Sequence, residues 1–382
     1  MTGPTNNSRA PQILRRRLLL FFLVSLVGFG TLIACSDFNY YLHTAGGHMK
    51  VMAERKSIPD LIANQSTPEE LRTRLKNIAW IRHFASDRLN LPENGSYQSY
   101  VELNRPYVVW NVVATPELSL EPLEWCFPFA GCISYRGYFD LEKAQEFAKH
   151  LQGEGYDITV SGVPAYSTLN WFDDPALSSF SQWSTSSVAR LIFHELAHQK
   201  LYVADDSAFN ESFATAVELY GVKLWLDRFG DEQEKAEYAL RLEHEKQFLE
   251  LTAGARQKLK KIYDSEMPDQ EKRVGKEAIF SDLRQRYAAL RDGWNGYGGY
   301  DRWFKVLNNA KFASVSTYHQ WVPAFRLVME QENNDFPAFY QRCEAISRLP
   351  REKRDALLQD LVTRFHQQER GSLTTANTSG KP

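Results

Sequence analysis

The spacing of apolar and polar residues predicts two helices near the start of the chain. Residues 36–60 favour a helix that Pro59 would end. The second helix starts at Thr67, which can cap it, and Glu70 completes a capping box. One apolar stripe with helical spacing follows, formed by Leu71, Leu75, Ile78, Ile81 and Phe84.

The middle of the chain is richer in β-branched and aromatic residues. Strands are predicted at 107–114, 133–139 and 157–160, with a helix at 141–151. We therefore expect a small mixed sheet with helices over residues 100–165. This region could be a scaffold only, or its edge strand could pair with an extended peptide. The polar and aromatic loop at 165–175 could line a cleft or pack as an ordinary loop.

From residue 185 onward the pattern is almost entirely helical. Charge-rich helices at 231–264 and 269–292 are expected to form an antiparallel hairpin, which is either simply solvated or a partner-binding coiled coil. Further helices cover 315–366, and the polar tail 367–382 is expected to be disordered. The fold class is therefore α+β, mainly helical, with a small mixed sheet and a helical C-terminal half.

Composition and charge add one expectation, that the protein has no nucleic-acid partner. The chain has 382 residues, of which 43% are hydrophobic, so it can bury a large core. The formal net charge is -2 and the two signs are interspersed. Such a surface gives no basic patch for nucleic acid, and we expect no nucleic-acid partner.

The N-terminus has the features of a targeting segment. Three arginines, at 15–17, precede an apolar run from Leu18 to Ala34 that is shorter than the about 20 residues a spanning helix needs. The run ends in Leu-Ile-Ala-Cys at Cys35, which resembles the lipobox of bacterial lipoproteins. The resemblance implies cleavage before Cys35 and lipidation of that cysteine, and Ser36 after it favours the outer membrane. An uncleaved anchor helix is the alternative, and either arrangement places the body outside the cytoplasm.

Three other cysteines remain. Cys126 and Cys132 lie six residues apart, and in an oxidising compartment they are best interpreted as a small-loop disulfide. Cys343 lies in a helical pattern and is expected to be a buried free thiol.

The residues with the clearest chemistry are His194, Glu195 and His198, which form an H-E-x-x-H pattern among apolar neighbours. Residues four apart lie on one face of a helix, so the two imidazoles can bind one zinc ion, with Glu195 as general base. This helix is expected to fade near Val203, and an Asp-Asp-Ser turn at 205–207 starts the next one.

A third ligand follows from the turn between these helices. His198 lies about 7.5 Å along the axis before Val203, and Glu211 lies about 6 Å after Ser207. If the helices fold back antiparallel, Glu211 is level with His198. Two histidines and one glutamate with an open fourth position form a hydrolytic zinc site. Glu218, on the same face as Glu211, could orient a ligand imidazole or be a plain salt-bridge residue.

The segment from Asn210 to Ala214 resembles the N-E-G-F-A block of gluzincins such as the aminopeptidase N family, in which the glutamate is the third zinc ligand. Several stretches are similar to the bacterial putative aminopeptidase family of envelope lipoproteins: the lipobox, the two zinc blocks, and residues 109–112, 164–169 and 307–310. The resemblance implies a zinc peptidase with a zincin-like core, which acts on peptides. The G-x-M-E-N block of aminopeptidase N is absent, so an endopeptidase stays open as the alternative to an aminopeptidase.

Peptide hydrolysis requires two further roles. Glu195 would take a proton from the zinc-bound water and pass it to the leaving amine. The oxyanion needs a donor, which gluzincins supply from a downstream Tyr or His. Tyr318 and His319 are the candidates here, against the alternative of a helix cap or core residue, and Tyr297 and Tyr300 are in reserve.

These observations predict a zinc-dependent peptidase tethered by Cys35 to the periplasmic face of the outer membrane. A non-catalytic, zinc-binding envelope lipoprotein is the alternative from a different class. The expected divisions are a signal peptide (1–34), N-terminal helices (35–99), a zincin-like core (100–230), a helical C-terminal part (231–366) and the tail (367–382).

Overall fold

The computed structural model describes residues 39–127 and 131–378, and the chain divides into two units that meet between Ala53 and Glu54. Of the first unit, the described part is one helix over residues 39–53. The predicted signal peptide and Cys35 lie outside the described residues. Among the residues that are described, no helix combines the length and hydrophobicity needed to span a membrane.

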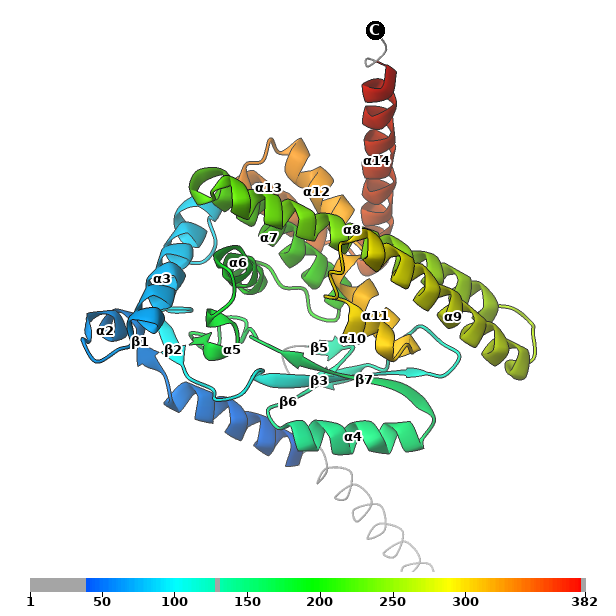
Figure 1. The fold of residues 1–382 in the computed structure, drawn as a ribbon, viewed down its shortest axis with the longest axis horizontal. Coiled ribbons are helices and arrows are strands. Elements are labelled where there is room, and N and C mark those ends of the chain that lie inside the picture. The colour runs from blue at the N-terminus through cyan, green and yellow to red at the C-terminus, as the bar shows by residue number, and fades with distance from the viewer. Residues whose placement is uncertain (1–38, 128–130, 379–382) are drawn as a thin grey trace, which may run out of the picture. The chain divides into compact units, whose positions relative to one another are not determined.

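The second unit is mainly helical with short strands, in agreement with the predicted α+β class (Figure 1). Its helices are α2 (Ile58–Ala63), α3 (Glu69–Leu89), α4 (Leu141–Gly153), α5 (Ser178–Ser181), α6 (Thr185–Lys200), α7 (Ser207–Phe229), α8 (Glu232–Tyr263), α9 (Asp269–Gly293), α10 (Asp301–Lys305), α11 (Asn309–His319), α12 (Val322–Gln331), α13 (Phe336–Ser347) and α14 (Arg351–Thr378). Its strands are β1 (Lys56–Ser57), β2 (Ser99–Val101), β3 (Val109–Pro116), β4 (Trp125–Phe127), β5 (Gly131–Ile133), β6 (Arg136–Tyr138), β7 (Tyr156–Val163) and β8 (Ala176–Leu177).

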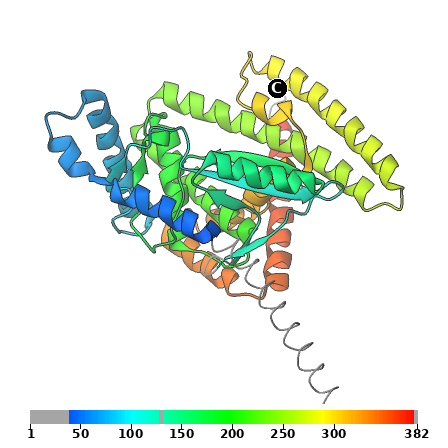
Figure 2. The same ribbon diagram turned by 90° about the horizontal axis from the view of Figure 1, so that it is seen from below.

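The strands form three small sheets rather than the single mixed sheet expected from the sequence. The largest has the order β6-β3-β7 and is antiparallel, with Val112 opposite Val160. Helix α4 packs on one of its faces and α11 on the other (Figures 1 and 2). A second sheet, β1-β2-β8, contains the parallel pair β2–β8, and β4 and β5 form a hairpin. The strands of the second sheet are too short to have given a sequence pattern.

Helices α6 and α7 pack antiparallel at the centre of this unit, with α3 against them. Fully buried aromatic side chains anchor both helices: Phe193 of α6 packs against Phe84 of α3, and Phe213 of α7 packs against Phe325 of α12 and Phe339 of α13. Gly221 allows the close approach, because a Cβ there would lie 2.8 Å from the Phe193 ring and 2.7 Å from Leu89. The antiparallel pairing places the polar residues of both helices level with one another.

Three predicted boundaries differ from the structure. The helix expected over 36–60 ends at residue 53, and Pro59 lies in the first turn of α2, where its missing N–H costs no hydrogen bond. Helix α3 begins after Pro68 with no side-chain cap, so the capping box at Thr67 does not form. Helix α14 continues to Thr378, because the expected tail begins with Gln367-Gln368-Glu369-Arg370, all good helix formers.

The hairpin of β4 and β5 is closed by a disulfide between Cys126 and Cys132. Gly131 has a φ of 75°, and a Cβ there would collide with Asp205. The backbone N–H of Cys132 donates to Asp205 Oδ1 at 2.6 Å. The disulfide-closed hairpin therefore rests on the turn that connects α6 to α7. Cys343 is a buried free thiol.

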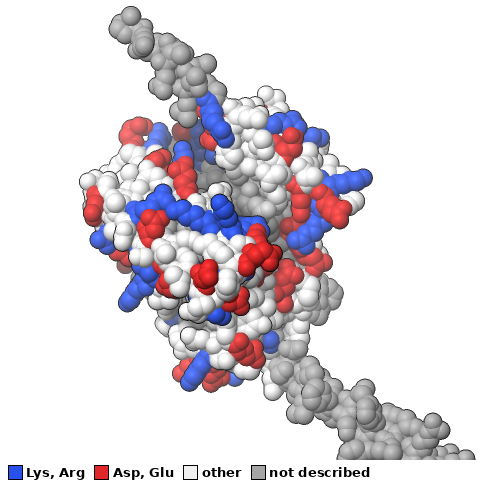
Figure 3. Space-filling view, turned by 90° about the vertical axis from the view of Figure 1, so that its right-hand side faces the viewer, with Lys and Arg blue, Asp and Glu red and all other residues white. Residues whose placement is uncertain are grey.

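Helices α8 and α9 form the second hairpin, which packs its inner face against α10 and α11. The buried cluster there includes Phe248, Leu259, Phe280, Leu283 and Phe312. The outer surface carries Lys and Arg interspersed with Asp and Glu, with no large area of one sign on the face shown in Figure 3. This arrangement agrees with the charge pattern in the sequence.

Removal of the disulfide should lower stability without unfolding the protein. The bond closes a loop of only a few residues, which corresponds to about 2 kcal/mol of lost chain entropy in the unfolded state. We expect the double substitution Cys126→Ala and Cys132→Ala to lower the free energy of unfolding, measured in urea, by about that amount. A reducing agent should have the same effect on the wild type and none on the double variant. Equal effects on both proteins would contradict this assignment.

Candidate metal centre

Three side-chain atoms from α6 and α7 converge on one point. His194 Nε2 lies 3.1 Å from His198 Nε2 and 3.2 Å from Glu211 Oε2. The separation between His198 Nε2 and Glu211 Oε2 is 3.6 Å. The three residues form a group that could hold a metal ion. The structure therefore brings together the two histidines of the H-E-x-x-H pattern and the glutamate of the following helix.

This geometry fits a tetrahedral ion. Ligand atoms about 2.1 Å from a tetrahedral centre lie about 3.4 Å apart, close to the three separations observed. The donor set of two imidazole nitrogens and one carboxylate oxygen is one that zinc accepts while retaining an open position. The ligand side chains are also largely buried, with exposed fractions of 13% for His194, 10% for His198 and 12% for Glu211.

The turn between the two helices sets this geometry. The Asn210 side chain accepts a hydrogen bond from the Val203 N–H at 2.8 Å and donates one to the Val203 carbonyl at 2.7 Å. Asp206 caps α7 by accepting from the Phe209 N–H, and its other oxygen accepts two hydrogen bonds from Arg354 on α14. Asn210, the residue next to Glu211, is thus held to the turn. This contact sets the position of Glu211 along α7, level with His198.

The charges of the centre are strongly coupled. Burial opposes the imidazolium form of His194, but hydrogen bonds with Glu211 and Glu218 outweigh it and raise the pKa of His194 well above its usual value. Burial would raise the pKa of Glu211, yet the charge of His198 and the hydrogen bond with His194 lower this pKa to about 2. The centre therefore favours a cation at the point where the three atoms meet.

Glu218 lies behind His194 and is 4% exposed. Its Oε2 is 2.9 Å from His194 Nδ1, and its Oε1 accepts from Arg190 Nε at 2.6 Å. Arg190 in turn donates from its two terminal nitrogens to the two oxygens of Glu245 on α8, both at 2.9 Å. The second nitrogen of His198 differs, because its Nδ1 is buried with no hydrogen-bond partner in the described part of the chain.

Glu195 projects from a different face of α6. Burial raises the pKa of its carboxyl group, although the charges of His194 and His198 oppose the rise. Gln199, one turn further, is on the same face and is held by Ser96 and Asp174. Tyr97, beside Ser96, is fully buried with a φ of 62°, and the charge of Glu195 acts on its hydroxyl group. One face of α6 thus carries ligands and another the candidate base.

The loop at 165–175 packs against the end of α6. Asn170 donates to the Gln199 carbonyl at 2.8 Å, and the Asp174 carboxylate accepts three hydrogen bonds, two from Thr168 and one from Gln199. The loop also exposes Trp171, with an exposed fraction of 62%. The loop therefore combines a buried polar anchor with an exposed aromatic tip. The anchor agrees with an ordinary packed loop, and the tip agrees with a loop that lines a cleft.

The candidate oxyanion donors lie at the end of α11. The Tyr318 side chain lies outside the described part of the structure. His319 is largely buried, which lowers its pKa, and the charges of Glu245, Arg190 and His194 act on it. The reserve candidates belong to the packing of α8, where Tyr297 stacks on His244 and Tyr300 stacks on Phe248.

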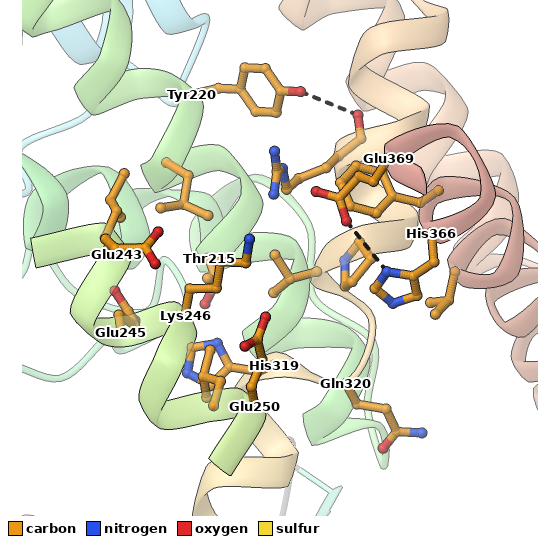
Figure 4. Close-up of a pocket in the computed structure, with 18 of the residues that line it drawn as sticks. Thr215, Tyr220, Glu243, Glu245, Lys246, Glu250, His319, Gln320, His366 and Glu369 are labelled. Atoms are coloured by element: carbon orange, nitrogen blue, oxygen red, sulfur yellow. Dashed lines mark hydrogen bonds and ion pairs between the residues drawn. The ribbon is translucent and has the colours of Figure 1, made fainter. Parts of the chain in front are cut away.

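A cavity of about 1830 Å³ lies next to His319 and Glu245, between α7, α8, α11, α12 and α14 (Figure 4). Its wall includes Thr215, Glu245 and His319, but none of the three candidate ligands is among the described residues that line it. The cavity thus lies on the side of Glu218 and Arg190 rather than on the side of Glu195.

Sequence reasoning missed several residues around the centre. Arg190 could have been found, because it lies four residues before His194 on the ligand face of α6. Glu245, Tyr97 and Asp174 are brought in by tertiary packing, and no spacing in the sequence indicates them.

Asp174 should make stability depend on pH. Burial raises the pKa of its carboxyl group from 3.8 to about 6. A raised folded-state pKa contributes stability that is complete below the unfolded value and is lost as pH rises through about 6. We expect the metal-free wild type to gain about 2 kcal/mol relative to Asp174→Asn when pH falls from 7 to 4. Urea unfolding of both proteins at each pH measures this, and a difference independent of pH would contradict it.

The comparison with curated proteins and that with solved structures gave no match. A family model described as "Putative aminopeptidase" matches residues 39–358, which is most of the chain and includes all three residues of the candidate metal centre. The putative aminopeptidase part of the resemblance is therefore confirmed, and the chain belongs to the "Putative aminopeptidase" family.

Proposed function

We propose that this protein is a zinc-dependent peptidase, with aminopeptidase activity as the leading assignment. The observation that carries the proposal is the convergence of His194, His198 and Glu211 at the separations of a tetrahedral site. The family description supports a peptidase. Zinc is the metal that suits two imidazoles and one carboxylate with an open position for water or substrate.

When bound at these three atoms, zinc would lower the pKa of a water molecule and polarise the peptide carbonyl group. Glu195 then acts as the proton carrier, receiving a proton from the water and delivering it to the leaving amine. Its raised pKa suits both steps, because a carrier must bind the proton and later release it. Glu218 holds the His194 ring from behind through Nδ1.

The proposal includes roles for the oxyanion donor, the core fold and the membrane anchor. Tyr318 and His319 are retained as candidate donors to the oxyanion, and the charge of His194 acts on His319. We further propose that α6, α7 and the small sheets form a zincin-like core. We also retain lipidation at Cys35 and attachment to the periplasmic face of the outer membrane, on the basis of the lipobox-like sequence.

The proposal predicts separate effects for the base and for a ligand. Purified wild type should contain one zinc per chain and cleave peptides. Glu195→Gln should retain zinc and lose at least about 100-fold in kcat, because general acid–base catalysis is removed. Glu211→Gln should lose zinc itself. Metal analysis and peptide hydrolysis of the three proteins provide the measurement.

Two results would exclude the proposal. A folded wild type that binds no zinc would remove the metal centre. Full activity in Glu195→Gln would remove the assigned base. Zinc binding with no hydrolysis of any peptide in a broad library would favour the non-catalytic lipoprotein instead, although a purely structural site has no need of Glu195.

Amino-terminal specificity can be tested separately. An aminopeptidase must bind the charged α-amine of its substrate, so acetylation of that amine should abolish cleavage of an otherwise identical peptide. Two described carboxylates lie behind His194, and both are already paired. Glu218 binds Arg190 and His194, and Glu245 binds Arg190. A different acidic group would therefore bind the α-amine. Mass spectrometry of the products reads out the cleaved bond. Internal cleavage of the acetylated peptide would identify an endopeptidase.

A further inference from the structure

A row of alternating charges extends from the metal centre into the helical hairpin. On α6, Arg190, His194 and His198 follow one another at intervals of four residues, on one face. On α7, Glu211 and Glu218 are seven residues apart on the facing side. The order in space is Glu245, Arg190, Glu218, His194, Glu211 and His198, with each neighbour in hydrogen-bond or ion-pair contact.

Both oxygens of Glu218 are engaged, one by His194 and one by Arg190. A carboxylate bound at both oxygens cannot turn about its last bond without breaking a contact. The orientation of the His194 ring therefore depends on Arg190 as well as on Glu218. A ligand imidazole is commonly fixed in this manner by an outer carboxylate, and loss of that partner weakens metal binding.

Arg190 is itself fixed from α8. Its two terminal nitrogens donate to the two oxygens of Glu245, which is the bidentate geometry that only a guanidinium provides. The exposed fractions of the side chains are 23% for Arg190 and 18% for Glu245, so solvent screens this pair less than it screens a surface pair. Glu245 is separated from Arg190 by 55 residues, and this contact joins the hairpin to the metal centre.

We propose that Arg190 and Glu245 are positioning residues of the metal centre, through which the α8–α9 hairpin holds His194 in its metal-binding orientation. The inference rests on the proposed function, since it takes His194 as a ligand. It assigns to the hairpin a role in metal retention beyond that of a solvated structural element.

The test measures zinc release into an excess of chelator from the full-length protein. Glu245→Gln keeps the shape of the side chain but removes its charge and one acceptor. We expect about tenfold faster zinc release from this variant, and about 10–100-fold faster release from Glu218→Gln, which removes the direct partner of the ligand. Arg190→Lys keeps the positive charge without the planar fork, and it should resemble Glu245→Gln.

Glu117→Gln is the matched control. Glu117 also accepts a bidentate contact from an arginine of the hairpin, Arg273, but this pair has no contact with the metal centre. Its substitution weakens the docking of the hairpin and should leave zinc release unchanged. Thermal unfolding of the metal-free proteins identifies any variant that fails to fold. If either Glu245→Gln or Arg190→Lys fails to fold, the other variant is used for the test.

The absorption spectrum of the cobalt-substituted proteins gives a readout that a general loss of stability would not move. The visible bands of Co²⁺ depend on ligand geometry, so Glu245→Gln and Arg190→Lys should shift them, whereas Glu117→Gln should not. Zinc release and spectra of both variants equal to those of Glu117→Gln would overturn the inference and leave the proposed function intact. Failure of the wild type to bind zinc would instead contradict the proposed function itself.

Discussion

The register between α6 and α7 is the constraint on which the candidate site depends. A shift of one residue along α7 would turn Glu211 by about 100° away from His198. Asn210 prevents this, because both its amide oxygen and its amide nitrogen bind the backbone of Val203. The turn is also held from outside, through Asp205 by the disulfide-closed hairpin and through Asp206 by α14. Three separate parts of the chain thus secure one short connection.

Electrostatics explains why the row of charges beside this turn is stable when largely buried. A buried carboxylate is costly unless opposite charges and hydrogen bonds compensate it, and removal of one partner leaves the other uncompensated. Here Glu218 lies between Arg190 and His194, and Glu211 lies between His194 and His198. The two ligand histidines are nevertheless unequal. His194 is fixed at both ring nitrogens, whereas His198 has no partner at Nδ1 among the described residues and depends on the packing around it.

The sequence was sufficient to predict those elements whose residues show a clear local pattern. Helical periodicity located α6, α7 and the α8–α9 hairpin to within a few residues, and the Asp-Asp-Ser turn explained why Glu211 meets His198. Features that depend on distant partners could not be found. Strands of two or three residues, such as β1 and β8, form only because β2 lies between them. The Arg190–Glu245 contact spans two helices with no shared spacing. The capping box at Thr67 failed because the sequence pattern permits a cap without requiring one.

Helix α6 has two functional faces, and this division limits where specificity can arise. One face is occupied by the ligands and Arg190, and another carries Glu195 above the polar anchor of Gln199 and Asp174. The polar groups that both faces present belong to the candidate metal centre or to the anchor beside the candidate base. In the proposed peptidase, selection among peptides would therefore depend on elements that surround α6. The loop at 165–175 touches the base side through Asn170 and Asp174, and the large cavity lies on the Arg190 side. Of the two, the loop is the one that approaches Glu195, because the charge of Glu195 acts on Asp174. In the proposed peptidase, residue preference would therefore depend on the exposed tip of this loop at Trp171.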